Sequence, residues 1–96
     1  MAIAVVATLK VASGKEQEFE GVFRELSAQV RANEPGNKLY QLCRSKADPS
    51  VYSVMEIYAD DAALAAHGAS EHFKAAGPKL GPCLGGRPEI QYFETV

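Results

Sequence analysis

The chain has 96 residues, and ten basic against twelve acidic side chains give it a formal net charge of −2 at pH 7. The basic residues are scattered along the chain, which argues against a nucleic-acid partner. The longest apolar runs, such as residues 3–9, are far shorter than the roughly 20 residues that span a bilayer, and no cleavable signal pattern is present. We therefore expect one cytoplasmic domain over residues 1–96, without a membrane partner.

The small size of the chain makes a partner subunit plausible. A domain of this length buries only about 60 to 65% of the surface that its unfolded chain exposes, so a second subunit would add to a thin core. The two cysteines, Cys43 and Cys83, do not form a CxxC motif and have no histidine at zinc-finger spacing. Neither a disulfide framework nor a thiolate metal site is indicated.

The first third of the chain predicts a strand and a long helix. Residues 3–11 are rich in β-branched side chains, with apolar residues at period two, and this indicates a strand. Ser13 to Glu16 has the S-x-x-E form in which serine caps a helix start. The following apolar stripe predicts a helix that ends at Glu34-Pro35-Gly36, because proline cannot continue it; the stripe consists of Phe19, Val22, Phe23, Leu26 and Val30.

The remaining segments predict a hairpin, two short helical pieces and a last strand. Residues 38–46 and 51–59 read as strands joined by an Asp-Pro turn. Asp60 or Asp61 could cap a helix start, and Ser70 offers a second cap, with a break expected near Gly68. Glycine-proline and glycine-glycine pairs make residues 77–86 loop-like, and residues 89–96 close the chain as a strand.

The element order βαββαβ predicts a ferredoxin-like α+β fold. Right-handed crossovers place both helical segments on one face of a four-stranded antiparallel sheet and leave the other face uncovered. Apolar residues occupy both alternating sets of strand positions, with Leu39 and Met55 in one set and Tyr40 and Val54 in the other. Both faces of the sheet are therefore expected to be apolar. Because an apolar face is not expected to remain in water, we predict a homodimer in which two sheets pack face to face.

Residues 52–73, YSVMEIYADDAALAAHGASEHF, contain a strand ending in E-x-Y, an acidic and Ala-rich helix, and then H-x-x-S-x-H-F. This segment resembles the antibiotic biosynthesis monooxygenase family, and in particular its quinol monooxygenase-like members. Weaker similarity extends over the whole chain. The resemblance implies a dimeric α+β barrel with a pocket between the sheet and the helices of each subunit.

The resemblance also nominates catalytic residues, namely His72, His67 and Glu56. In the implied scheme His72 is the base, Glu56 orients it, and His67 delivers a second proton. Glu56 would be an ionisable group on an apolar strand face, which needs a partner. Structural alternatives remain open: His67 as a cation at a helix end, His72 as a surface residue, and Glu56 at an exposed strand end.

Aromatic side chains could form the substrate pocket, and we expect Tyr40, Tyr52, Tyr58 and Phe73 to line it, although such residues are also common in cores. Arg87 could steady an anionic substrate. We expect no metal, because a five-residue histidine spacing places the side chains about 140° apart on a continuous helix and no third ligand is evident. No nicotinamide, flavin or P-loop motif occurs, and haem-degrading relatives use a tryptophan that this chain lacks.

Together the resemblance and the residues predict a cofactor-free monooxygenase that oxidises a small electron-rich phenol, quinol or polyketide-like ring with dioxygen. A second hypothesis is an isomerase of a small oxygenated or phosphorylated signal molecule, which would use the same proton-transfer groups. A third hypothesis is a non-catalytic dimeric ligand-binding or stress-response module, because this fold hosts many functions.

Overall fold

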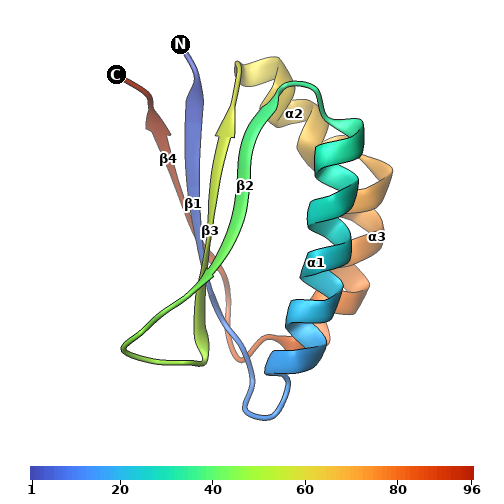
Figure 1. Ribbon diagram of the computed structural model, residues 1–96, viewed down its shortest axis with the longest axis vertical. Coiled ribbons are helices and arrows are strands. Elements are labelled where there is room, and N and C mark those ends of the chain that lie inside the picture. Colours follow the sequence, from blue (N-terminus) through green and yellow to red (C-terminus); the bar gives the residue numbers. More distant parts are fainter.

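The computed structural model describes residues 1–96, and Figure 1 shows a sheet with the helices packed along one side. In chain order the elements are β1 (Ile3–Lys10), α1 (Glu16–Asn33), β2 (Asn37–Arg44), β3 (Val51–Tyr58), α2 (Asp61–Ala69), α3 (Glu71–Leu80), a 3₁₀ turn (Gly81–Cys83) and β4 (Glu89–Glu94). The strands begin and end within one or two residues of the predicted limits.

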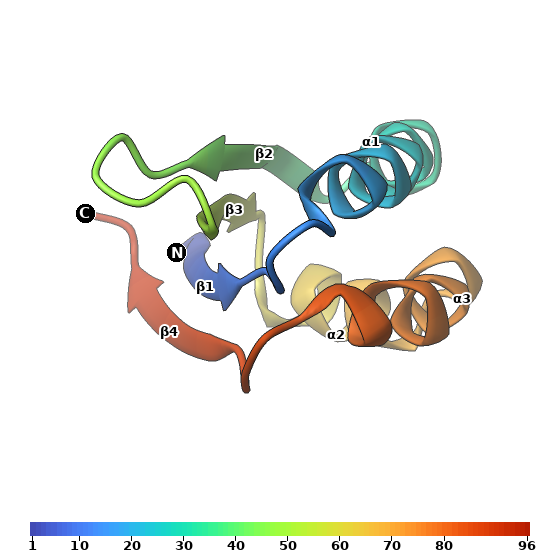
Figure 2. The ribbon, with the colours of Figure 1, turned by 90° about the horizontal axis from the view of Figure 1, so that it is seen from below.

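The sheet confirms the predicted ferredoxin-like arrangement. Its strand order is β2-β3-β1-β4, and all three neighbouring pairs are antiparallel. Seen from below, α1, α2 and α3 all lie on the same side of the sheet (Figure 2). Both crossovers therefore cover one face, as right-handed connections require.

The inner face of the sheet and the apolar stripe of α1 form the core. Phe19, Phe23, Leu26 and Val30 of α1 are all buried, as the helical spacing predicted. They pack against the inward residues of the strands, and the ring of Phe19 lies 4.9 Å from that of Tyr52. The period-two pattern of β3 likewise buries Tyr52, Val54, Glu56 and Tyr58 in succession.

The outer face of the sheet carries large apolar side chains that nothing in the subunit covers. Leu39 is 40% exposed, Met55 46% and Phe93 47%. They come from β2, β3 and β4, so the apolar surface spans the sheet rather than one strand. The structure thus has the uncovered apolar face that the strand parities predicted. No helix combines the length and the apolar character needed to cross a membrane.

The helix ends confirm two predicted caps and contradict one. Asp60 accepts a hydrogen bond from the Ala63 amide, and Ser70 accepts one from the Phe73 amide. Ser13 was wrongly predicted to cap α1. The helix begins only at Glu16, after a turn in which Gly14 has a φ of +86°, so the Ser13 hydroxyl does not cap it, and the Glu16 carboxylate accepts from the Gly14 amide instead.

The segments before and after Ser70 confirm one local prediction and correct another. The break between α2 and α3 falls at Ser70, within two residues of Gly68 as predicted, because the Ser70 cap starts a new helix. The Gly77-Pro78 pair was predicted to be loop-like, but α3 continues through it to Leu80. Pro78 lacks the N–H for one helical hydrogen bond and its ring crowds the carbonyl four residues earlier, but α3, which packs against α1, still continues to Leu80.

Candidate functional site

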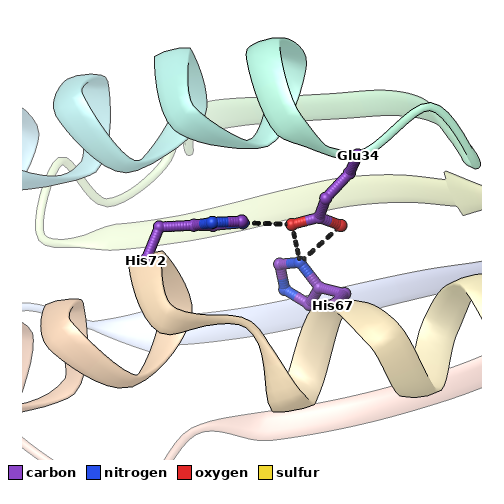
Figure 3. Close-up of side chains that lie close together, drawn as sticks. All are labelled: Glu34, His67 and His72. Atoms are coloured by element: carbon purple, nitrogen blue, oxygen red, sulfur yellow. Dashed lines mark hydrogen bonds and ion pairs between the residues drawn. The ribbon is translucent and has the colours of Figure 1, made fainter.

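One carboxylate and two imidazoles, carried by three helix ends, meet in a cluster (Figure 3). Glu34 follows the last turn of α1, His67 lies in the last turn of α2, and His72 lies in the first turn of α3. The Nδ1 atom of His67 is 3.1 and 3.0 Å from the two Glu34 carboxylate oxygens, and Nε2 of His72 contacts Oε2 of Glu34. The side chains are only 6% (His67), 8% (Glu34) and 14% (His72) exposed.

The break at Ser70 brings both histidines to the same carboxylate. The Ser70 hydroxyl donates to the His67 carbonyl at 2.7 Å and also accepts from the Phe73 amide, so one residue closes α2 and opens α3. On a continuous helix a five-residue spacing would turn the two imidazoles about 140° apart. The change of direction at Ser70 removes that restriction, and both rings face Glu34 (Figure 3).

When the two imidazoles are neutral, an ionised Glu34 sets their tautomers. An ionised carboxylate can only accept hydrogen bonds, so the ring nitrogen that faces it must carry the proton. His67 then donates from Nδ1 and keeps its lone pair on Nε2, on the ring edge away from Glu34 (Figure 3). His72 donates from Nε2 and keeps its lone pair on Nδ1. The two histidines therefore offer different atoms as proton acceptors.

A cavity of about 530 Å³ lies between the sheet and the helices. Of its 20 lining residues 14 are hydrophobic, and the others include Glu56 and His67. Tyr40 and Phe73, both expected at the pocket, also line it, whereas Tyr52 and Tyr58 do not. The cavity is therefore an apolar chamber with one imidazole and one carboxyl group on its wall.

His72 lies on the other side of the cluster. It does not line the apolar cavity but a groove between α1 and α3, together with polar side chains such as Glu25, Gln29 and Glu71. The predicted trio is thus only partly assembled: Glu56 and His67 share the cavity, and the group that contacts His72 is Glu34 rather than Glu56.

Glu56 is buried in the middle of β3 and not at an exposed strand end. Burial raises the pKa of its carboxyl group, and the Tyr58 hydroxyl, which donates to it at 2.6 Å, partly opposes that rise. Burial and the same hydrogen bond raise the pKa of Tyr58. Burial, with the charges of Glu56 and Glu34, raises the pKa of Tyr40. Both tyrosines stay neutral at physiological pH and can donate protons in hydrogen bonds.

His67 is held by aromatic rings as well as by Glu34. Its ring centroid lies 5.3 Å from those of Tyr40 and Tyr58 and 4.7 Å from that of Phe73. It is therefore a buried group on the cavity wall, in the last turn of α2. Tyr52 has a different role, since its hydroxyl donates to Glu20 on α1 and its ring packs in the core. Arg87 is absent from the cavity lining, so it does not offer a charge to a ligand there.

Sequence reasoning missed Glu34, which it treated only as part of the helix end. A signal for it existed: Glu34 follows Val30 by four residues and so continues the buried stripe of α1. An acidic residue on an apolar stripe needs a partner inside the protein. The two histidines that supply it are more than 30 residues further along the chain.

The fold and the buried carboxylate–imidazole site define a ferredoxin-like α+β protein with an apolar cavity between the sheet and the helices. A family model described as antibiotic biosynthesis monooxygenase matches residues 2–79. The chain belongs to this family. Among curated proteins, no sequence matched it.

Three solved structures illustrate the similarity. A "putative antibiotic biosynthesis monooxygenase" from Caulobacter crescentus is 53% identical, with a TM-score of 0.97, over 99% of this chain and 90% of that one. A conserved protein from Methanosarcina mazei is 30% identical, with a TM-score of 0.94, over 100% and 94% of the two chains. A Nitrosomonas europaea protein with 19% identity and a TM-score of 0.94, covering 99% and 90%, supports the fold alone.

Proposed function

We propose that the protein is a cofactor-free monooxygenase that oxidises a small electron-rich phenol or quinol with dioxygen, and that His67 is its base. Family membership supports monooxygenase-type activity. The observation that carries the rest is the position of His67, which lines the apolar cavity while Glu34 holds its Nδ1–H. The lone pair of Nε2 is then free to accept a proton inside a chamber that would take an aromatic ring.

This assignment differs from the expected one, in which His72 is the base and Glu56 orients it. His72 directs Nε2 to Glu34 and lines the groove between α1 and α3, so it does not reach a ring in the cavity without rearrangement. In the proposed scheme Glu34 positions both imidazoles. Glu56 and Tyr58 form a hydrogen-bonded pair beside the cavity, and Glu56 contributes a carboxyl group to its wall.

The proposed reaction begins when His67 Nε2 removes the proton of a phenolic hydroxyl. The phenolate donates electron density to dioxygen, and a C–O bond forms at a ring carbon that carries hydrogen, giving a peroxide. Loss of that ring proton and cleavage of the O–O bond then produce a quinone and one water molecule. A phenol plus O₂ gives a quinone plus H₂O, so all four electrons come from the substrate and no external reductant is needed.

The cavity favours this reaction over isomerisation of a phosphorylated molecule. No lysine or arginine lines it, so a phosphate group would enter an apolar chamber without a cationic partner. A neutral aromatic ring needs no such partner. Its hydroxyl group can instead contact the polar groups of the lining, His67 and Glu56.

The uncovered outer face of the sheet supports the homodimer as part of the proposal. Leu39, Met55 and Phe93 present an apolar surface opposite the helices, and a second sheet packed against it would remove it from water. The catalytic groups lie on the inner face, so each subunit would carry its own chamber.

The experiment that tests the function is dioxygen uptake by the purified protein across a panel of phenols, quinols and hydroxylated polycyclic rings. The expected result is one O₂ consumed per quinone formed, with one atom of ¹⁸O₂ in the quinone. Hydrogen peroxide as the coproduct would indicate an oxidase instead. Conversion of a substrate without dioxygen uptake would favour the isomerase, and tight binding without any conversion would favour a ligand-binding module.

A further inference from the structure

The carboxylate and the two imidazoles that meet between the helices also form a donor set for a metal ion. Glu34, His67 and His72 each offer one ligand atom, and these atoms all lie within 4.8 Å of one another. Ligands bound to a tetrahedral zinc ion at about 2.0 to 2.2 Å are separated by roughly 3.4 Å. The separations between Nδ1 of His67 and the Glu34 oxygens, 3.0 and 3.1 Å, are close to that value.

We propose that this cluster binds a first-row divalent transition metal through Nδ1 of His67, Nε2 of His72 and the Glu34 carboxylate, and that the bound ion switches off the proposed base. Two imidazoles with one carboxylate suit zinc and its neighbours, whereas magnesium and calcium prefer all-oxygen sites. The fourth position would be filled by water, as in open zinc sites.

Two objections raised by the sequence do not hold in the structure. The five-residue histidine spacing was expected to separate the imidazoles, but the break at Ser70 turns both toward Glu34 (Figure 3). A third ligand was not evident, and Glu34 supplies it from the end of α1. The side chains come from three helix ends that pack on one another, so little ordering remains to be done when an ion binds.

The groove between α1 and α3 gives the ion a route from solvent. His72 lines this groove beside Glu25, Gln29 and Glu71, and the two carboxylates raise the local concentration of cations. The ion would therefore reach the cluster from the side opposite the apolar cavity. A substrate in the cavity and an ion at the cluster would contact opposite edges of the same His67 ring.

The inhibitory effect rests on the proposed function and follows from the tautomer of His67. A neutral imidazole carries one proton, which lies on Nδ1 when Glu34 accepts from it. A metal ion on Nδ1 places that proton on Nε2. The edge that faces the cavity then donates a hydrogen bond and no longer accepts a proton, so the phenol is not deprotonated.

The binding half of the proposal is tested by titrating metal-stripped protein with Zn²⁺ in a calorimeter. We expect one ion per chain, with affinity reduced about 100-fold or more in His72→Gln and Glu34→Gln, beyond what changes outside the ligand set usually cause. His72→Gln retains an N–H that can face Glu34, which limits any loss of folding. Glu71→Gln, next to His72 but outside the cluster, removes one charge from the groove and no ligand, so it should lower the affinity far less than either ligand variant. No saturable binding up to about 1 mM Zn²⁺, or equal affinities for wild type, His72→Gln and Glu34→Gln, would overturn the proposal.

The tautomer change is tested by ¹⁵N NMR of the imidazoles, which does not depend on activity. His67 should show a protonated Nδ1 in the metal-free protein and a protonated Nε2 in the zinc complex. An unchanged His67 signal on zinc binding would overturn the switch. Where a phenol is turned over, one equivalent of Zn²⁺ should abolish dioxygen uptake and a chelator should restore it. Faster uptake with zinc would contradict inhibition, whereas failure of every phenol would count against the function and leave the NMR result to decide the site.

Discussion

Two histidines contact the Glu34 carboxylate from different sides, and their surroundings differ. On one side His67 is enclosed by three aromatic rings and lines an apolar cavity. On the other side His72 lines a polar groove that opens between α1 and α3. Their shared partner dictates which nitrogen of each ring carries a proton. The surroundings decide what the remaining nitrogen faces: the apolar cavity for Nε2 of His67, and the polar groove for Nδ1 of His72.

The largest effect should come from replacing His67 by an amide that copies its donor, with the matching replacement of His72 for comparison. His67→Asn can still donate toward Glu34 but has no basic nitrogen, so we expect turnover to fall by about 10² to 10⁴. Partial rescue should appear as pH rises toward the pKa of an unperturbed phenol, near 10. His72→Gln should lose much less activity. Steady-state dioxygen uptake over a pH series measures both, and a larger loss in His72→Gln would reverse the assignment of the two sides.

A second prediction tests whether the dimer forms through the outer face of the sheet, which would leave both histidine environments within one subunit. Met55→Glu puts a charge on the apolar outer face, beside Val6 and Gln41 on the flanking strands, where a second sheet would have to bury it. We expect the dimer dissociation constant to rise at least about 100-fold, equal to about 2.8 kcal/mol. Sedimentation velocity at micromolar concentration measures this. Ala28→Glu, on the exposed side of α1, is the matched control and should leave the association unchanged.

Removing the charge of Glu34 should loosen its control over the tautomers of His67 and His72 and leave the cavity intact. An amide in Glu34→Gln offers one oxygen and one NH₂ group, so it can satisfy both imidazoles only if one of them reverses its tautomer. We expect kcat to fall about 10- to 100-fold with little change in KM, as for other groups that orient a reacting imidazole. Glu25→Gln, in α1 and outside the contacts of Glu34 with the two histidines, is the control. An equal loss in both variants would indicate a general effect of charge.

The smallest effect concerns Glu56 and the stability of the fold. Burial raises the pKa of Glu56 in the folded state above its unfolded value, so the folded protein binds more protons in the interval between the two values. Stability from this group is present below the unfolded pKa and is lost as pH rises through the folded pKa. Glu56→Gln keeps an oxygen for the Tyr58 hydroxyl and should remove this loss. Thermal melts should show the variant gaining stability relative to wild type as pH rises from 4 to 8, with about 4 to 8 °C in Tm for each kcal/mol. A difference in Tm that stays constant with pH would contradict the prediction.

The sequence by itself determined the elements, their order and the two faces of the sheet, because these depend on local periodicity and caps. The stripe of α1, the alternation of β3 and the caps at Asp60 and Ser70 all act over a few residues, and all are present in the structure. The local errors, at Ser13 and Pro78, lie where a turn or packing outweighs a short motif. The resemblance over residues 52–73 identified both histidines, since the motif contains them.

Only the tertiary structure decided which groups act together. Glu34 precedes its histidine partners by 33 and 38 residues, and no local pattern states that three helix ends converge. Glu56, expected to orient His72, instead pairs with Tyr58 two residues away, because alternation places both on the inner face of β3. Whether a buried carboxylate contacts one histidine or another depends on crossover geometry and on the direction that each helix takes after its cap. Those quantities are set by packing over the whole chain, which is why the site could be nominated but not assembled from the sequence.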